Sequence, residues 1–255
     1  MGLIVDVFSA RSDNFGYLVH DTATGRTAAI DAPEAAAIKT ALLHRGWTLT
    51  DIFITHHHID HVEAIAELKA EFGTRVVGPR AEADKIAGLD ELVAGGETVS
   101  LGETVFAIYD TPGHTLGHVV FHDKVEKHLF TADALFSLGV GRMFEGTPAP
   151  MWEGVKALRA LPDDTLVYCG HEYTASNAKF ALSIDPDNAA LQKRAAEVTE
   201  LRAAGRATIP FPLGEDKAAN PFLRADDPVL ARHFGLEGAD PAAVFAAIRK
   251  AKDNF

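Results

Sequence analysis

The pattern of hydrophobic and polar positions changes along the chain. Up to residue 173, short runs of apolar and β-branched residues alternate with longer runs that have the apolar spacing of amphipathic helices. Hairpin-linked strands mixed with helices that each bury one face predict an α/β domain with two sheets and helices outside them. We expect strands at 3–8, 17–20, 27–30, 49–55 and 75–78, a run of strands that ends near 136, a strand at 166–169, and helices at 33–44, 62–72, 80–87 and 150–161.

The composition changes beyond Tyr173. The segments that follow are rich in Ala, Leu, Lys, Arg and Glu, which favour helices, and contain few β-branched residues. Pro210, Pro212 and Gly214 indicate a long connection inside this region. The sequence therefore predicts two domains, and the second is small and all-α. The predicted domains cover 1–173 and 174–255, with helices in the second at 175–183, 188–204, 228–234 and 241–251.

Four candidate metal ligands lie where the strand at 49–55 gives way to a helix. Side chains alternate while the chain remains extended, so His56, His58 and Asp60 can face the same way. His61, on the first helical turn, can point back towards the same cluster. Imidazole suits zinc and iron, and a carboxylate can bridge or complete such a site. The spacing HxHxDH therefore indicates a metal site.

The same segment has a structural interpretation. Asp60 followed by Glu63 has the pattern of a helix N-cap with its reciprocal acid, and histidines near strand ends often serve only as hydrogen-bonding groups. A single histidine favours that interpretation, whereas four aligned candidates favour a metal site. His57 faces the other way, and we interpret it as a supporting or structural residue.

Three further strand ends each carry one ligand type. His114 follows one predicted strand, Asp133 follows the next apolar run, and His171 follows the strand at 166–169. Gly113 and Gly170 allow a sharp turn or a close approach of the backbone beside two of them. Each residue alone is weak evidence, because such positions usually hold turn or core-edge residues. Their joint match to the first segment makes them candidate ligands.

These residues, taken in order, resemble the metallo-β-lactamase superfamily, whose signature is HxHxDH followed by a separate His, an Asp and a last His. The match spans roughly the first two thirds of the chain. The resemblance implies an αββα sandwich that binds two divalent metal ions, with zinc as the default and iron or manganese as alternatives. It implies one ion on His56, His58 and His114, the other on Asp60, His61 and His171, and Asp133 bridging both.

Length and composition agree with an ordinary globular enzyme of 255 residues, 47% of them hydrophobic. No apolar stretch approaches the roughly 20 residues that cross a bilayer, and residues 1–10 lack a signal-peptide pattern. We therefore expect a cytoplasmic monomer with no membrane partner. The net charge of -12 argues against nucleic acid as a partner. The single cysteine, Cys169, is expected to be a buried thiol rather than a nucleophile.

The helical extension narrows the resemblance to glyoxalase II, the hydroxyacylglutathione hydrolases, over essentially the whole length. The supporting segments are GVGRMFEG at 139–146, CGHEYT at 169–174, NPFLR at 220–224 and RKAKD at 249–253.

In that family such segments bind the glutathione part of the substrate, which implies binding roles for Arg142, Tyr173, Arg249 and Lys252. Two of these, Arg249 and Lys252, are three apart and share one helix face. The chain departs from the family at Phe144, where a tyrosine hydroxyl is common.

The resemblance implies hydrolysis of S-(2-hydroxyacyl)glutathione thioesters, typically S-D-lactoylglutathione to D-lactate and glutathione, by a hydroxide that bridges two metal ions. Asp60 and Asp133 are the expected catalytic carboxylates, and no covalent acyl-enzyme is required. The main alternative is a glutathione-persulfide dioxygenase with a single iron. A β-lactamase fits less well, because such enzymes normally carry an export signal and lack a helical extension of this kind. The intact ligand set speaks against a non-catalytic binding protein, and the acidic charge without an evident basic region speaks against a metal-dependent nuclease.

Overall fold

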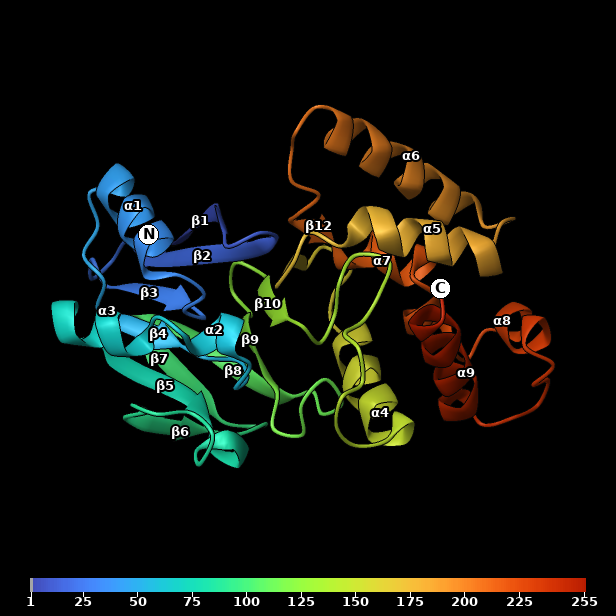
Figure 1. Ribbon diagram of the computed structural model, residues 1–255, viewed down its shortest axis with the longest axis horizontal. Coiled ribbons are helices and arrows are strands. Elements are labelled where there is room, and N and C mark those ends of the chain that lie inside the picture. The colour runs from blue at the N-terminus through green and yellow to red at the C-terminus, as the bar shows by residue number, and fades with distance from the viewer. Residues whose placement is uncertain (1) are drawn as a thin grey trace. The chain divides into compact units, whose positions relative to one another are not determined.

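The computed structural model describes residues 2–255. Strands and helices alternate along the chain, as Figure 1 shows. The chain divides into two units. The first unit contains the residues before Thr111 together with Thr115–Phe130, and the second contains Thr111–His114 and Thr131–Phe255. Each unit is described in turn.

The first unit contains a six-stranded sheet with the order β1-β2-β3-β4-β5-β6. Strands β1 to β3 are antiparallel neighbours, whereas β3 to β6 pair in parallel. Parallel neighbours need a crossover, and helices provide it between β3 and β4 and between β4 and β5. The strands are β1 Leu3–Ala10, β2 Asn14–Asp21, β3 Thr27–Ile30, β4 Asp51–Phe53, β5 Arg75–Pro79 and β6 Glu91–Val93; the helices are α1 Ala35–Arg45, α2 Ile59–Val62 and α3 Ile65–Phe72.

Helices α1 and α3 pack on this sheet through a cluster of aliphatic side chains. Ile38 and Leu42 of α1 and Leu68 of α3 lie in one buried cluster with Ile52 of β4 and Val76 of β5. Burying an aliphatic side chain of this size contributes about 1.5–3 kcal/mol. The sheet therefore has one face covered by helices, as the sequence predicts.

Aromatic side chains fill the space between this sheet and the strands of a second sheet in the same unit. The ring centroid of Phe53 lies 5.7 Å from that of Phe106 and 5.5 Å from that of Phe121. Tyr17 meets Phe130 edge to face at 5.7 Å. The interior of this unit is therefore a sandwich of two sheets. The second sheet has six strands, and the four described with this unit have the order β10-β9-β8-β7, with β7 Thr98–Leu101, β8 Thr104–Asp110, β9 Val119–Asp123 and β10 His128–Ala132.

The second unit begins with the end of β10 and is mostly helical. The amide of Gly170 donates to the carbonyl of Ala132 (2.8 Å), and β11 pairs antiparallel with β12. Phe222 contacts both Phe180 and Phe245, and these rings form the centre of a helical core. The elements are β11 Leu166–Cys169, β12 Phe211–Pro212, α4 Pro148–Arg159, α5 Thr174–Ile184, α6 Ala189–Ala203, α7 Leu213–Ala219, α8 Pro228–His233 and α9 Pro241–Asp253, with short 3₁₀ turns η1 Arg80–Glu82 in the first unit and η2 Pro221–Arg224 here.

Most predicted strands and helices are confirmed, including all four predicted C-terminal helices, but three predictions are wrong in part. The predicted helix at 80–87 is only the turn η1, because Glu82 turns inward and accepts hydrogen bonds there. The predicted helix at 62–72 is interrupted where the amide of Ala64 donates to Ala32 instead of to the preceding turn. The long connection predicted around Pro210 contains β12 and α7. None of the helices in residues 2–255 combines the length and hydropathy that a membrane crossing requires.

Helix α7 carries a buried carboxylate that organises the second unit. Asp216 Oδ1 accepts from the amide of Leu138 (2.9 Å) and Oδ2 accepts from the side-chain amide of Asn220 (2.8 Å). Leu138 has a positive φ of 60°, so its backbone needs this support. Burial outweighs these hydrogen bonds and raises the pKa of Asp216 to about 6.

This raised pKa gives a test of stability against pH. Between about pH 4 and 6, Asp216 retains a proton in the folded chain that it releases in the unfolded chain. The free energy of unfolding that this proton contributes therefore falls as the pH rises, and it is lost above about pH 6. Lowering the pH from about 7.5 to 5 should stabilise the wild type by about 1 kcal/mol relative to Asp216→Asn. Urea unfolding at both pH values measures this difference, and parallel changes in the two proteins would contradict it.

Candidate metal centre

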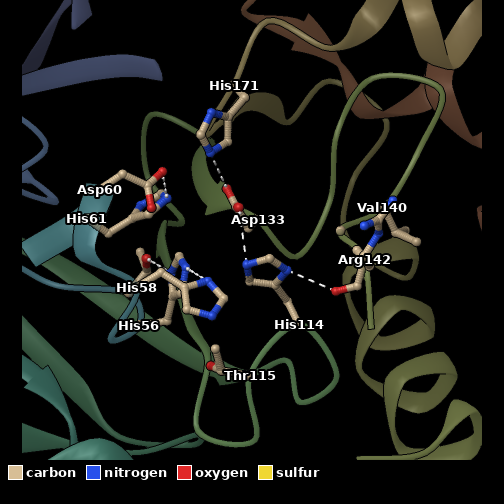
Figure 2. A network of polar contacts seen from close by, with 12 residues as sticks. His56, His58, Asp60, His61, His114, Thr115, Asp133, Val140, Arg142 and His171 are labelled. Carbon is tan, nitrogen blue, oxygen red and sulfur yellow. Dashed lines mark hydrogen bonds and ion pairs between the residues drawn. The ribbon is translucent and has the colours of Figure 1, made fainter. Parts of the chain in front are cut away.

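In the first unit, the segment between β4 and α2 brings four candidate ligands together (Figure 2). The segment leaves β4 at Phe53, remains extended to His58 and enters α2 at Ile59. His56 Nε2 lies 3.2 Å from His58 Nδ1, and His61 Nε2 lies 3.4 Å from Asp60 Oδ2. The sequence prediction that these side chains converge is confirmed within this unit.

A carboxylate that the sequence interpretation missed, Asp31, fixes the orientation of two of these histidines. Asp31 directly follows β3 and has a positive φ of 58°. Its Oδ2 lies 2.7 Å from His61 Nδ1, and it accepts from the hydroxyl and the amide of Thr55. Because the Thr55 hydroxyl donates to Asp31, it accepts from His56 Nδ1 (3.0 Å). In its neutral form each histidine therefore carries its proton on Nδ1, which leaves the lone pair of Nε2 for a metal ion.

Asp60 is oriented by another residue that the sequence interpretation missed. The side-chain amide of Asn14, on β2, donates to Asp60 Oδ2 at 3.0 Å. Asp60 does not cap its helix, since the N-cap position belongs to His58 and has no side-chain cap. The N-cap interpretation of this segment is therefore wrong. The only signal for Asn14 and Asp31 was their place at strand ends, which many polar residues share.

His57 points away from this cluster, as its position predicts. Its Nδ1 lies 2.8 Å from Glu82 Oε2. Glu82 is buried and its other oxygen accepts from the Thr115 hydroxyl and from the amide of Gly117. His57 thus supports the turn at 80–82 and the loop at 115–117.

In the second unit, Asp133 lies between two histidines. Asp133 follows β10, His171 follows β11, and His114 ends the short segment that begins at Thr111. His114 Nε2 lies 3.2 Å from Asp133 Oδ2, and His171 Nε2 lies 3.4 Å from Asp133 Oδ1. Figure 2 shows Asp133 flanked by the two rings. The convergence of these three strand-end residues is also confirmed.

The backbone beyond Asp133 fixes the tautomer of His114. His114 Nδ1 lies 2.9 Å from the carbonyl oxygen of Arg142, which can only accept, so Nδ1 carries the proton. Gly141 permits this contact, because a Cβ there would lie 2.0 Å from the carbonyl oxygen of Asp133 and 3.0 Å from His114 Nδ1. No side chain larger than hydrogen fits at Gly141 without moving the loop.

The donor sets fit divalent metal ions. With Nδ1 protonated in His61 and His114, each Nε2 lone pair faces a carboxylate oxygen at 3.4 Å and 3.2 Å respectively. Two lone pairs at that distance repel each other, so either a proton or a metal ion has to lie between them. The histidine and aspartate clusters fit a dinuclear metal site, and imidazole with carboxylate suits zinc, iron and manganese alike.

The residues implied in glutathione binding all belong to the second unit. The Tyr173 ring stacks on that of His171, with centroids 4.8 Å apart and planes 3° apart, and is 41% exposed. Arg142 is exposed and places its Nε 3.5 Å from Asp253. Lys252 donates to the carbonyl of Ser176 (3.2 Å). Arg249, in contrast, is only 6% exposed.

Two further residues singled out in the sequence differ in exposure, since Phe144 is exposed and Cys169 is buried. Phe144, where the family commonly has tyrosine, is 60% exposed and meets the His114 ring edge to face at 5.4 Å. Cys169 is fully buried, and burial raises the pKa of its thiol far above the usual value. The expectation that Cys169 is buried is therefore confirmed, and its low reactivity stays a prediction.

The chain is similar to known proteins over its full length. A family model described as "Metallo-beta-lactamase superfamily" matches residues 13–171, and one described as "Hydroxyacylglutathione hydrolase C-terminus" matches 172–255. A relative from Bradyrhizobium sp. (strain ORS 278), named hydroxyacylglutathione hydrolase, is 55% identical over 254 residues, which is 100% of both chains.

Solved structures show the same fold. The BLEG-1 B3 metallo-beta-lactamase superposes with a TM-score of 0.67 at 20% identity, covering 86% of this chain and 99% of its own. TTHA1623, solved in a di-iron-bound form, superposes with a TM-score of 0.54 at 26% identity, covering 66% of this chain and 91% of its own. The expected metallo-β-lactamase fold with a helical C-terminal region is thereby confirmed.

Asp31 should control metal binding although it is not among the expected ligands. Asp31→Asn replaces one accepting oxygen by an amide that cannot accept from both Thr55 and His61. We expect the affinity for zinc to fall by about 10–100-fold, as for other residues that orient a ligand. Chelator competition measures this. Asp51→Asn is the matched control, since Asp51 is equally buried and pairs with Arg75, and it should lower stability while zinc affinity stays unchanged.

Proposed function

The chain belongs to the hydroxyacylglutathione hydrolase family, and on this basis we propose that it hydrolyses S-(2-hydroxyacyl)glutathione thioesters, typically S-D-lactoylglutathione to D-lactate and glutathione. The observation that carries the proposal is the contact between candidate ligands and candidate substrate-binding residues within the second unit. Tyr173 stacks on His171, and the carbonyl of Arg142 accepts from His114. A substrate held by Tyr173 and Arg142 would therefore lie beside the metal ligands.

We propose that two divalent ions occupy the centre, with zinc as the default metal. When bound, they would lower the pKa of a water molecule and polarise the thioester carbonyl. The di-iron form of TTHA1623 supports two ions, and the convergent lone pairs within each unit support the ligands. The proposed ligands are His56, His58 and His114 for one ion, Asp60, His61 and His171 for the other, and Asp133 for both.

The protein's own groups have defined tasks in this proposal. Asp60, held by Asn14, orients the attacking water through a carboxylate oxygen. Asp133 holds His114 and His171 on its two oxygens. The leaving group is the thiolate of glutathione, which needs no strong general acid because thiols have a pKa near about 8.5. Cys169 takes no part, since its thiol is buried and protonated.

The glutathione part of the substrate is proposed to bind to the second unit. Glutathione carries two carboxylates, so an acidic protein needs a local group of cations to accept it. Arg142, Tyr173 and Lys252 are exposed enough to contact it directly, and Arg249 lies buried beneath them. We propose 1–173 as the metal-binding domain and 174–255 as the glutathione-binding domain.

The alternative, a glutathione-persulfide dioxygenase, is not favoured, because the full-length relatives are named as hydrolases. The decisive experiment compares thiol release from S-D-lactoylglutathione with oxygen uptake on glutathione persulfide, using protein of known metal content. We expect thiol release without oxygen uptake, and loss of thiol release when a chelator removes the metal. Oxygen uptake with one iron per chain would overturn the proposal. A monomeric state, a cytoplasmic location and the absence of nucleic-acid partners stay predictions from the sequence.

Lys252→Met should raise KM for S-D-lactoylglutathione by about 10-fold, because a hydrogen bond to a charged group contributes about 1.5–3 kcal/mol. The value of kcat should change little, since the cation holds a remote part of the substrate in ground and transition states alike. Steady-state thiol release measures both. Lys250→Met on the same helix is the matched control with unchanged KM, and an equal rise there would mean that only general charge matters.

A further inference from the structure

Glu172 lies between two residues of the proposed site, the candidate metal ligand His171 and the candidate substrate contact Tyr173. The rings of these two neighbours stack on each other, with centroids 4.8 Å apart and planes 3° apart. The Glu172 side chain is only 11% exposed, and its carboxylate contacts Thr208, which is 36 positions further along the chain. The residue between the two stacked rings is thus directed into the helical part of the same unit.

Both carboxylate oxygens of Glu172 hold Thr208. Oε1 accepts from the Thr208 hydroxyl (2.8 Å), and Oε2 accepts from the Thr208 amide (2.9 Å). Arg202 Nη1, which also donates to the carbonyl of Arg206, lies 3.3 Å from Oε2 and adds an opposite charge. Hydrogen bonds to an ionised carboxylate are stronger than those between neutral groups, and two of them to one residue fix orientation as well as position.

Thr208 is a firm point of attachment, because helices hold it in turn. Its side chain is buried and its carbonyl accepts from Nη2 of Arg194, on α6, at 2.7 Å. Since the Thr208 hydroxyl donates to Glu172, it accepts from the hydroxyl of Thr174, the first residue of α5, at 2.6 Å. Arg194 is also buried, and its further contacts are with Ser137, Glu197 and the ring of Phe211.

The helix that begins beside Glu172 does not use its carboxylate. Helix α5 starts at Thr174, its N-cap residue is Tyr173, and no side chain caps it. A carboxylate next to a helix N-terminus commonly accepts from the first amides of that helix. Glu172 accepts from Thr208 instead, so its contacts fix the segment at 171–174 against a distant part of the unit.

The stacked rings have an aromatic contact that does not replace this attachment. The centroid of the Phe136 ring lies 6.2 Å from that of His171 and 5.5 Å from that of Tyr173. Contacts between rings tolerate a range of offsets and tilts. The hydrogen bonds of Glu172 are directional, so they add a restraint on how the peptide between the two rings is rotated.

We propose that Glu172 is a positioning residue that sets the placement of both its neighbours, the metal ligand His171 and the substrate contact Tyr173, through its two hydrogen bonds to Thr208. The inference rests on the proposed function and deepens it, because one carboxylate would then serve metal binding and substrate binding together. A displacement of the peptide at 172 moves both neighbours, since each is bonded directly to it.

The test measures zinc affinity by chelator competition without substrate, and kcat and KM at saturating zinc. Glu172→Met removes both hydrogen bonds and should weaken one of the two zinc ions by about 10–100-fold, as for other residues that orient a ligand. It should also raise KM for S-D-lactoylglutathione by about 5-fold, because a misplaced binding group loses affinity. Glu172→Gln can accept from the Thr208 amide and donate to its hydroxyl, so it should restore zinc affinity and KM to within about 3-fold of the wild type.

A double-mutant cycle separates positioning from a general loss of stability. Tyr173→Phe removes a hydroxyl and keeps the ring that stacks on His171. It should raise KM by about 5-fold in the wild type. In Glu172→Met the same change should raise KM by less than about 2-fold, because the tyrosine is already misplaced there. Equal effects in the two backgrounds would contradict the proposal.

Asp185→Asn is the matched control in the same unit. Asp185 is a buried carboxylate that pairs with Arg224 and accepts from the side-chain amide of Asn188 (2.9 Å), and it follows the last residue of α5. This variant should lower stability in urea unfolding while zinc affinity and KM stay unchanged. The same defects in Asp185→Asn as in Glu172→Met would overturn the proposal.

If Glu172→Met fails to fold, Thr208→Val decides the question, since it removes the hydroxyl that donates to Glu172 and keeps the amide. We expect its zinc affinity to fall by at least about 3-fold. Wild-type zinc affinity and KM in either variant that folds overturns the proposal. A wild-type chain that binds fewer than two zinc ions, or that releases no thiol, would instead refute the proposed function.

Discussion

A histidine binds a metal ion only through an unprotonated nitrogen, and much of this structure serves to decide which nitrogen that is. Asp31 decides it for His61 directly and for His56 through the Thr55 hydroxyl. A backbone carbonyl, that of Arg142, decides it for His114. In each case the partner lies at the end of a strand or in a tightly packed turn, so the tautomers depend on groups that the fold holds in place.

The candidate ligands lie at strand ends, where the sheets provide rigid support. His56 and His61 are almost completely buried, so their ring nitrogens have left bulk water. Burying such a polar group costs free energy that its hydrogen bonds, here to Asp31 and Thr55, must offset. The aromatic interior around Phe53 and the aliphatic cluster under α1 and α3 hold the motif segment in place against this cost. The geometry suits cations because the fold holds oxygen and nitrogen lone pairs close together.

The sequence predicted the seven candidate ligands because their spacing and their places after strands are local features. It also predicted most helices and strands from the spacing of hydrophobic residues along the chain. It missed Asp31 and Asn14, since a polar residue at a strand end has no distinguishing local mark and its partner lies far along the chain. It missed α7 because Pro212 and Gly214 resemble a loop, whereas Gly214 is small in order to pack against Asp163. The helix predicted at 80–87 was wrong because contacts made by Glu82 outweigh helix propensity.

The cations on the last helix show why residue type and spacing do not determine the surroundings of a side chain. Arg249 and Lys252 are three apart, which places them about 60° apart around the helix axis. That angle suffices to direct Arg249 inward to the carbonyl of Val140 and Lys252 outward to Ser176. Arginine suits the inner position because its flat fork can donate to a carbonyl and a carboxylate at once while an aromatic ring covers it. Lysine suits the outer one, where a single flexible charge donates to the carbonyl and the hydroxyl of Ser176. Two cations three residues apart on one helix can thus have different surroundings, because one is buried against a carbonyl and a carboxylate and the other reaches a polar residue near the surface.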